Sequence, residues 1–554
     1  MKEIPQRNRN LCMRMFRCLT DAGSSKQVCL LLLICFIAAA LRLYGLAGEG
    51  LWYDEGCSIY LSDYASRCDR LLNMDYCNDP PLFLVLLLGW RRILSSISGS
   101  LATDFMLRLL PCFFSVITVP AVYGAFRGLL QYRTTPETSP QDSRFAELSA
   151  LAAAFLVAVS PFHRYYAQEL RCYSLLTFLA VLVLWNFIAA LRDNRLWQWI
   201  TLTLLLSLSL WTHFFSAWLF LVLDLYLLLT FRAHKKRYIP WALCHIAALL
   251  LSLPALLLAW RMSQVVAAIA VQWIPPPGLK TLFITFKTFF AGYSPRSLVY
   301  WPLFLLSAGL CLFGVRALRH SRQNLLLLLL WAGLPMVSSA VLWRIRDFSY
   351  YELRLFIWCA PAAALLAACG WASMRFRTRI VIGSVFLLLT GLLLSDGMAH
   401  ALHPVPQHRL GVRYKVDNRG AARYLASYAF AGEPVYHSSH VTLPSFRFYL
   451  PGHEHTHICL TRDDREGFFS AYPNRPLWTH LNFQPTPWHA LASFPRSFWL
   501  VRSWWEPFEV PENLFLLEKE IEQQCVREEE LAFFGITLIH YQRRGTPSGQ
   551  EFLQ

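Results

Sequence analysis

Long apolar runs, separated by short polar stretches, fill the chain from residue 28 to residue 397 and then stop. A helix rises about 1.5 Å per residue, so roughly 20 consecutive apolar residues cross the hydrocarbon core of a bilayer. The pattern therefore predicts a polytopic α-helical membrane protein with about eleven transmembrane helices. The predicted spans lie near residues 28–47, 107–126, 146–162, 172–191, 197–213, 214–231, 239–260, 298–315, 323–343, 354–374 and 380–397.

One apolar run does not fit this series. It extends from Pro80 to Trp90 and is followed by Arg91 and Arg92, so it is too short to span a bilayer comfortably. Counting it as a span would invert every later loop. We predict instead that residues 81–92 form an amphipathic helix that lies in the membrane interface, within the first outer loop.

Basic residues between the apolar runs predict the orientation of the chain. They form six clusters, and all six fall on one side of the membrane if residues 81–92 do not span it. Because basic loops are retained on the cytoplasmic side, we expect a cytoplasmic N-terminus and an extracytoplasmic region after residue 398. The clusters are Arg7 to Lys26, Arg127 and Arg133, Arg192 and Arg195, Arg232 to Arg237, Arg316 to Arg322, and Arg375 to Arg379.

Composition and charge indicate what kind of partner the protein has. The 554 residues are 55% hydrophobic and only 16% charged, which is typical of a membrane protein rather than a soluble one. The formal net charge of +16 could suggest nucleic acid, but the basic residues fall in short clusters between apolar runs. We interpret them as topology signals and expect a membrane, not a nucleic acid, as the partner.

The chain divides into two parts. Residues 1–397 form the predicted transmembrane domain, in which the outer loop 48–106 is the longest early polar segment. Residues 398–554 are polar and aromatic-rich and are long enough for one extracytoplasmic domain. Alternating helix and strand signals predict a small α/β fold for this second part. The signals are a helix at 421–425 and strands at 434–437, 498–501 and 536–541.

Histidines and cysteines of the outer regions raise two further hypotheses. His453, His455 and His457 would share one face of a strand, so they could bind a metal, although no fourth ligand is evident. A role of this domain in covering the site or holding an acceptor is favoured over metal binding. Disulfides could form within the outer regions if these face an oxidising compartment. The cysteines concerned are Cys57, Cys68 and Cys77 in the first loop and Cys459 and Cys525 in the tail.

Unusual polar groups gather on the predicted outer face. Asp54 and Glu55 follow the first apolar run directly, where carboxylates persist mainly if they face water, an ion or a substrate. Carboxylates that can take a proton, beside cations that can hold a phosphate, are what transfer from a phosphate-linked donor requires. The other groups are Asp79 before Pro80 and Pro81, the tract His163 to Arg171, His213, Arg344, Arg346 and Arg354.

Several of these groups also have ordinary structural interpretations. Asp79 could be a turn or cap residue. His163 and His213 could be hydrogen-bonded interfacial histidines, and Arg344 and Arg346 could extend to lipid headgroups. The tract His163 to Arg171 is harder to explain in this way, because so dense a polar segment between two spans needs partners.

Four segments give the chain a resemblance to a known family. They are Leu41 to Gly56 (LRLYGLAGEGLWYDEG), Asp79 to Trp90 (DPPLFLVLLLGW), Leu107 to Tyr123 (LRLLPCFFSVITVPAVY) and Ser160 to Leu175 (SPFHRYYAQELRCYSL). Thr212 to Phe215, and Arg354-Leu355 with Pro361, match weaker signatures. The sequence resembles the bacterial family 39-like glycosyltransferases, relatives of protein O-mannosyltransferases and lipid A aminoarabinose transferases. Their shared architecture is the C-type glycosyltransferase fold.

Two positions depart from the family pattern. Asp79 stands where the family usually has a basic residue before Pro-Pro-Leu, and Leu355 follows Arg354 where a tyrosine is usual. Substrate contacts near Asp79 are therefore expected to differ from those of relatives, whereas phosphate binding by Arg354 is retained as an expectation.

The resemblance implies a reaction and a set of residues. These enzymes take a sugar from a polyprenyl-phosphate carrier at the outer face of the cytoplasmic (inner) membrane, and an inverting single displacement is expected. By position, Asp54 is the base toward the acceptor hydroxyl, with Glu55 beside it. Arg171 and Arg354 would stabilise the phosphate, and Glu55 and Glu169 would orient Asp54, hold the sugar or bind a divalent metal ion. Asp79, Tyr166, Gln168 and His213 complete the expected substrate-binding set.

Other functions share some of these features. A transporter or flippase for lipid-linked glycans would also be polytopic, but it predicts charged residues near mid-membrane that are accessible from both sides. Here the polar groups gather on one face, which favours an enzyme. A polymerase or ligase for surface polysaccharide would share the chemistry and differ in its acceptor, which could be a lipid, a glycan or a protein.

Overall fold

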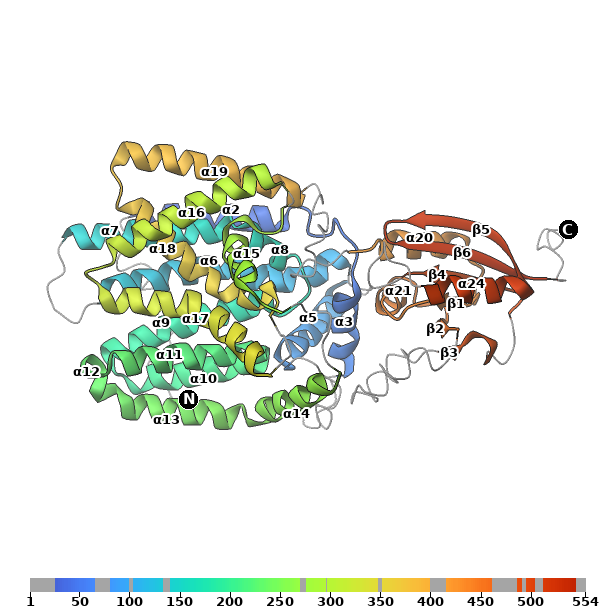
Figure 1. Ribbon diagram of the computed structural model, residues 1–554, viewed down its shortest axis with the longest axis horizontal. Helices are drawn as coiled ribbons and strands as arrows, with labels where there is room; N and C mark the ends of the chain where they lie inside the picture. The colour runs from blue at the N-terminus through green and yellow to red at the C-terminus, as the bar shows by residue number, and fades with distance from the viewer. Residues whose placement is uncertain are drawn as a thin grey trace, which may run out of the picture.

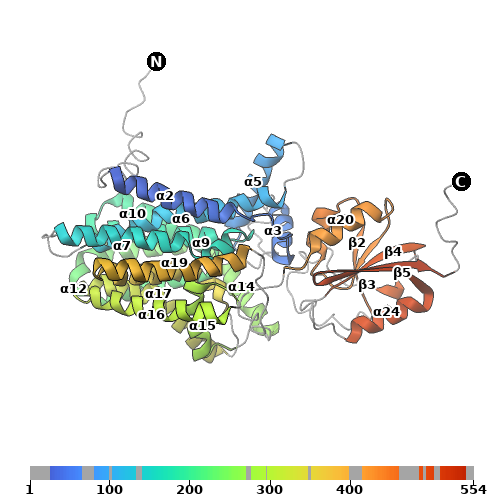
Figure 2. The same cartoon turned by 90° about the horizontal axis from the view of Figure 1, so that it is seen from above.

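The computed structural model describes residues 25–64, 80–98, 103–132, 140–269, 276–294, 296–346, 351–398, 415–460, 486–490, 495–503 and 512–544. The described residues between 25 and 398 form an elongated helical bundle, and those between 415 and 544 form a separate α/β unit at one end of it (Figure 1). Figure 2 shows the same division from above.

The bundle consists of helices with apolar residues around most of their circumference. In α2, Ile34 and Ala38 are buried while Leu32 and Phe36 are exposed, as expected of a helix between a protein core and lipid. The helices are α2 (Ser25–Leu43), α3 (Tyr53–Tyr64), α5 (Leu82–Ser98), α6 (Asp104–Gln131), α7 (Pro140–Ala158), α8 (Pro161–Ala167), α9 (Tyr173–Asp193), α10 (Leu196–Thr212), η2 (Phe214–Ser216), α11 (Ala217–Leu229), α12 (Phe231–His234), η3 (Lys235–Arg237), α13 (Tyr238–Leu251), α14 (Leu253–Ile269), α15 (Leu279–Ala291), α16 (Ser297–Ala317), α17 (Arg322–Arg346), η4 (Leu353–Cys359), α18 (Ala360–Ala372) and α19 (Phe376–Met398).

Every predicted apolar run coincides with a helix, but the number of clear spans is smaller than eleven. Within the described residues, seven helices are long and apolar enough to cross a membrane, or nine if two bent pairs each count as one span. One pair joins α7 to α8 at 54°, and the other joins η2 and α11 to α12, η3 and α13 at 93°. α10 is apolar but has only 17 residues. The multi-pass architecture is confirmed.

The basic turns of the bundle lie together at one end. The turns between α9 and α10, α11 and α13, α16 and α17, and α18 and α19 all face away from the C-terminal unit (Figure 1). The opposite end carries α3 and α5 beside the C-terminal unit (Figure 2). α5 contains the segment predicted to lie in the interface, and it is not among the helices that qualify as spans.

A buried cation contacts the bend between α7 and α8. Arg42 of α2 is completely buried and donates to the carbonyls of Val157 and Ala158, at 3.1 and 2.7 Å, and to Ser115 Oγ at 2.7 Å. The last carbonyls of a helix have no partner within the helix, so these bonds end α7 without a polar group left in an apolar setting. The polar tract that follows is thereby held beside the end of α2.

A mixed sheet organises the C-terminal unit, and its six strands among the described residues have the order β3-β2-β1-β4-β6-β5. β1 pairs in parallel with β2 and β4, β2 pairs in parallel with β3, and β6 is antiparallel to both β4 and β5. The elements are α20 (Asn418–Tyr428), β1 (Val435–His437), α21 (Leu443–Tyr449), β2 (His455–Cys459), β3 (Thr486–Pro487), η6 (Trp488–Ala490), β4 (Ser497–Arg502), α24 (Glu512–Gln524), β5 (Cys525–Phe533) and β6 (Ile536–Arg543).

Both faces of this sheet are covered, which explains the unbroken apolar run in β4. Trp499 and Val501 join a core with α20 and α21, while Phe498 and Leu500 join a second core with α24. A strand buried on both faces needs apolar residues at every position. The predicted α/β fold, its helix at 421–425 and its three strands are confirmed.

The structure bears on two hypotheses, a metal site at the histidines of the tail and disulfides between cysteines of the outer regions. β2 begins at His455, so His455 and His457 are alternate buried residues, but no group of three or more metal-binding side chains converges among the described residues. Cys57 and Cys525 are free thiols, Cys459 is buried in β2, and Cys68 and Cys77 lie outside the described residues.

Candidate active site

Asp54 and Glu55 lie in the first turn of α3, at the end of the bundle that faces the C-terminal unit (Figure 1). Negative charge is favourable there, because the N-terminus of a helix carries partial positive charge. The Trp52 N–H donates to Glu55 Oε2 at 3.3 Å and satisfies one backbone group at the helix start. The two adjacent carboxylates nevertheless have very different surroundings.

Glu55 is 0% exposed and is bound through both oxygens. Arg108 of α6 donates from Nε to Oε1 at 2.8 Å and from Nη2 to Oε2 at 2.6 Å, and the Leu170 N–H donates to Oε1 at 2.8 Å. Burial acts to raise the pKa of Glu55, but the charges of Arg108 and Lys415 outweigh it and the pKa is lowered. Glu55 therefore ties α3 to α6 and to the loop after α8.

Arg108 also fixes the loop that leads into α3. It donates to the carbonyls of Leu46, Glu49 and Gly50 at 3.2, 2.7 and 3.0 Å, so every part of its guanidinium group is used. Arg108 was not among the predicted site residues. A lone arginine inside an apolar run was the available signal, because a cation in a span needs a buried partner.

Asp54 is the accessible member of the pair. Its side chain is 21% exposed, and its Oδ2 lies 3.5 Å from Nη1 of Arg354 in η4. Arg354 is 13% exposed, pairs with Glu352, and lies 5.7 Å from the ring centroid of Tyr173. A carboxylate that can accept a proton thus faces a guanidinium group that can hold a phosphate. Glu352 and Tyr173 are further site residues that sequence reasoning missed.

The polar tract His163 to Arg171 forms α8 and the loop into α9. Glu169 in this loop is 2% exposed, and its Oε2 has no hydrogen-bond partner among the described residues. Burial raises the pKa of Glu169 to about 7. The Tyr166 hydroxyl hydrogen-bonds with that of Tyr293 at 2.7 Å, and the Tyr166 ring packs edge-on against Tyr173.

Gln168 and Arg171 contact different elements of the bundle. The side-chain amide of Gln168 donates to the carbonyls of Arg42 and Tyr44, both at 2.8 Å, and so anchors the tract to the end of α2. Arg171 Nη1 donates to Ser58 Oγ of α3 at 3.4 Å. Arg171 therefore contacts α3, whereas Gln168 contacts the end of α2.

Three further polar residues named in the sequence are His213, Asp79 and Arg344. His213 is buried at the turn after α10, accepts from the Phe215 N–H through Nδ1 at 3.1 Å, and lies 6.1 Å from the Tyr173 ring. Asp79 lies outside the described residues. Arg344 is exposed beside Trp343, with 5.5 Å between the guanidinium carbon and the ring centroid.

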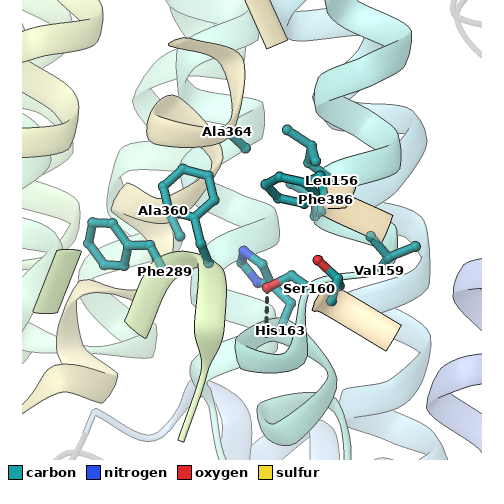
Figure 3. Close-up of a pocket in the computed structure, with 11 residues that line it drawn as sticks. Leu156, Val159, Ser160, His163, Phe289, Ala360, Ala364 and Phe386 are labelled. Atoms are coloured by element: carbon teal, nitrogen blue, oxygen red, sulfur yellow. Dashed lines mark hydrogen bonds between the residues drawn. The ribbon is translucent and has the colours of Figure 1, made fainter. Parts of the chain in front are cut away.

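A small cavity lies beside His163 at the start of α8 (Figure 3). Its volume is about 10 Å³, close to that of one water molecule. Ser160, Phe289, Ala360 and Phe386 line it together with His163, whose Nε2 has no hydrogen-bond partner among the described residues (Figure 3). His163 therefore faces a small cavity of the bundle whose lining does not include Asp54 or Arg354.

The C-terminal unit packs directly on the loop before α3. Asn418 donates to the Leu51 carbonyl at 2.9 Å, and Arg419 donates to the carbonyls of Ala47 and Gly48, both at 2.8 Å. Tyr449 of α21 donates to Asp104 of α6 at 2.7 Å and accepts from the Leu51 N–H at 2.7 Å. The position of Asp54 is thus fixed from the bundle and from the C-terminal unit together.

The described site residues do not form a metal-binding group. No three histidine, cysteine, aspartate or glutamate side chains converge in the described part of the chain. Glu55 is occupied by Arg108, so it offers no free oxygen for a divalent ion.

Comparison with known proteins adds evidence on the fold. No family model matches the chain, and no curated protein sequence matches it. The structure is similar to the crystal structure of ArnT from Cupriavidus metallidurans in the apo state, with TM-score 0.60 and 15% identity over 92% of this chain and 97% of that chain. It is similarly close to ArnT from the same organism bound to undecaprenyl phosphate, with TM-score 0.57 and 14% identity over 94% and 98%. The chain has the C-type glycosyltransferase fold.

The C-type fold was the one that the sequence motifs predicted, and that prediction is confirmed. Because the likeness covers nearly all of both chains, the helical bundle and the C-terminal unit both belong to the shared architecture. At this level of identity the likeness concerns the fold, so the role of each side chain has to be argued from its own contacts.

Proposed function

We propose that this protein transfers a sugar from a polyprenyl-phosphate-linked donor to an acceptor hydroxyl at the outer face of the cytoplasmic membrane. The observation that carries the proposal is the position of Asp54, a partly exposed carboxylate 3.5 Å from the guanidinium of Arg354. The C-type fold and the undecaprenyl phosphate bound to ArnT support a lipid-linked donor.

In this reaction Asp54 is the base, and Arg354 and Arg171 are the cations that stabilise the leaving phosphate. Asp54 takes the proton of the acceptor hydroxyl while the hydroxyl oxygen attacks the anomeric carbon of the sugar. A new glycosidic bond forms, the bond between that carbon and the phosphate oxygen breaks, and the electron pair leaves with the phosphate. Arg354 stabilises the phosphate as its negative charge increases, with Arg171 as a second cation nearby. A single displacement of this kind inverts the anomeric configuration.

Supporting roles follow from the contacts. Glu55 holds α3 through Arg108 and so fixes the neighbouring Asp54, rather than touching the substrate itself. Glu169 keeps one buried oxygen unpaired among the described residues, which suits an acceptor for a sugar hydroxyl. Asp54 and Arg354 supply the base and the first cation of this mechanism.

The orientation and location belong to the same proposal. The basic turns at the far end of the bundle would face the cytoplasm, and the C-terminal unit, with Asp54 beneath it, would be extracytoplasmic. The acceptor would be a lipid, a glycan or a protein that approaches from that side.

The test is sugar transfer by membranes that contain the wild type, Asp54→Asn or Asp63→Asn, supplied with a panel of radiolabelled polyprenyl-phosphate sugars. Asp63 is the matched control, since it lies on the same helix but pairs with Arg91 at the surface. We expect transfer to be lost in Asp54→Asn and kept in Asp63→Asn at equal expression. Normal turnover by Asp54→Asn would refute the assigned base. Movement of lipid-linked glycan across the bilayer without consumption of any donor would indicate a transporter instead.

A further inference from the structure

An apolar groove runs along the bundle between α2 and α19. Its walls are formed by residues from Leu30 to Ile37 of α2 and from Ile382 to Leu387 of α19, and its floor is formed by α7 and α18. Figure 2 shows α2, α7 and α19 side by side along the bundle. The groove has a volume of about 320 Å³ and an apolar lining. We refer to it as the α2–α19 groove.

The groove has the width of one hydrocarbon chain. In α7 the lining extends from Leu148 to Leu156, which is about 12 Å along a helix axis. Spread over that length, the volume corresponds to a cross-section of roughly 25 Å², which is too narrow for a helix about 10 Å across. The rim residues Leu30 and Leu387 are 45% and 46% exposed, so the groove is open toward the surrounding lipid.

The lining determines what kind of group the groove can hold. Water needs two or more polar partners in a cavity, and this lining offers almost none. An unfilled groove would also deprive the lining residues of dispersion contacts on one side. A hydrocarbon chain restores these contacts, so the occupant is an apolar chain rather than water or a polar metabolite.

Each wall of the groove carries a cation one turn before its first lining residue. Lys26 precedes Leu30 by four residues in α2, and Arg379 precedes Ile382 by three residues in α19. Residues three or four apart lie on the same face of a helix. Both cations therefore lie on the groove sides of their helices, at the end of the bundle that carries the basic turns.

Arg379 is held in place at this end of the groove. Trp371, which lines the groove, donates from Nε1 to the Arg379 carbonyl at 2.8 Å. The Arg379 guanidinium carbon lies 5.9 Å from the ring centroids of both Trp371 and Phe376, and its Nε has no hydrogen-bond partner among the described residues. The sequence has no acidic residue in α2 or α18, or in α19 before Asp396. The positive charge at the end of the groove thus suits an anion from outside the chain.

We propose that the α2–α19 groove binds an acyl chain of an anionic phospholipid, whose phosphate lies between Lys26 and Arg379. The lipid would come from the leaflet that borders the basic turns. A donor lipid placed for sugar transfer would instead carry its phosphate at Arg354, which precedes α18, whereas Arg379 follows it. The site is therefore separate from the proposed active site, and it does not depend on the proposed function.

Photo-crosslinking in vesicles tests the site directly. The purified full-length protein is placed in phosphatidylcholine vesicles that contain a trace of phosphatidylglycerol with a diazirine in the middle of one acyl chain. Adducts are located by mass spectrometry, and phosphatidylcholine with the same diazirine is the reference lipid. We expect adducts on residues 148–156 of α7, with labelling by phosphatidylglycerol about fivefold stronger than by the reference lipid.

Two pairs of variants separate the headgroup from the chain. Arg379→Gln should remove the preference for phosphatidylglycerol, whereas Arg377→Gln, an equal loss of charge at an exposed position of the same turn, should keep it. Ala152→Phe should fill the groove and lower labelling by both lipids. Gly391→Phe, at an exposed position of α19 with open space beside it, should not. If Ala152→Phe folds poorly, the arginine pair carries the test, because it leaves the groove unfilled.

Four outcomes would overturn the proposal. Equal labelling by the two lipids would indicate an ordinary boundary lipid, and the absence of adducts on α7 and α18 would indicate that no chain enters the groove. An equal loss of preference in Arg377→Gln and Arg379→Gln would assign the effect to general surface charge. Loss of the phosphatidylglycerol adducts on addition of an equimolar amount of undecaprenyl phosphate would assign the groove to a polyprenyl chain instead.

Discussion

Glu55 and Arg108 form a completely buried, two-bond salt bridge that joins α3 to α6, with N–O distances of 2.8 and 2.6 Å. The neighbouring carboxylate, Asp54, has no such clamp and faces Arg354 at 3.5 Å. Two adjacent acidic residues thus have separate tasks, because successive residues of a helix point in directions about 100° apart. One fixes the helix and the other remains available to a substrate.

Removing one member of the buried pair should destabilise the protein strongly. Arg108→Met leaves Glu55 buried without its guanidinium partner, and breaking a buried pair in this way typically costs about 3–5 kcal/mol. We expect a clearly lower melting temperature and a loss of transfer in purified protein. Arg92→Met is the control, because Arg92 of α5 is exposed. If the two variants had the same melting temperature, the pair of Glu55 and Arg108 would have no structural role.

Replacing Arg354 should act mainly on donor binding. In Arg354→Ala, the loss of a charge-assisted contact worth about 1.5–3 kcal/mol should raise the apparent KM for the lipid donor roughly tenfold or more. Arg344→Ala provides the comparison, since Arg344 is exposed at the end of α17. Steady-state transfer with varied donor concentration measures both. An unchanged KM in Arg354→Ala would remove this arginine from the donor site.

A methyl group at Gly56 should disturb the contact between α3 and α21. A Cβ there would lie 2.8 Å from Pro444 Cβ and 3.0 Å from the Ser445 nitrogen, so the two elements would have to separate. We expect Gly56→Ala to lower stability by about 1–3 kcal/mol, as overpacking does. Gly89→Ala, in α5, has open space for the same methyl group and should melt like the wild type. Equal melting of both variants would contradict close packing at Gly56.

Acid should destabilise the C-terminal unit through two buried histidines. His437 and His455 share a hydrogen bond of 3.0 Å, and their other ring nitrogens bond to Thr442 Oγ1 and the Leu450 carbonyl. Burial lowers the pKa of both imidazoles, that of His455 to about 4. The folded state therefore binds these protons less readily than the unfolded state, whose histidines titrate near pH 6.5.

The pH window follows from that difference. The contribution of the neutral histidines to the free energy of unfolding is fully present above about pH 6.5. It should fall as the pH decreases toward 4, by about 3 kcal/mol for His455 alone. Melting temperatures measured between pH 7.5 and 4 would show this decline. The double variant His437→Gln, His455→Gln should show a weaker decline, whereas His489→Gln, at an exposed position, should not differ from the wild type. A decline unaffected by the double variant would assign acid sensitivity to other groups.

Sequence reasoning located Asp54, Glu169 and Arg354, and the structure brings Asp54 and Arg354 together across 300 residues of chain. Arg108 and Lys415 were not predicted from the sequence. Arg108 lay within an apolar run, where its partner could not be known, and Lys415 lay in the other part of the chain. Both act through contacts between segments distant in sequence, and such contacts have no local pattern.

The sequence by itself determined the membrane architecture, the position of the acidic pair and the α/β character of the C-terminal unit. These features depend on local properties, namely the length and periodicity of apolar runs and the placement of charges beside them. Only the tertiary structure decided which carboxylate is buried and which is accessible, and which cation each one meets. The reason is that burial and pairing depend on segments packed from elsewhere in the chain, and these two quantities set the chemistry of an ionisable group.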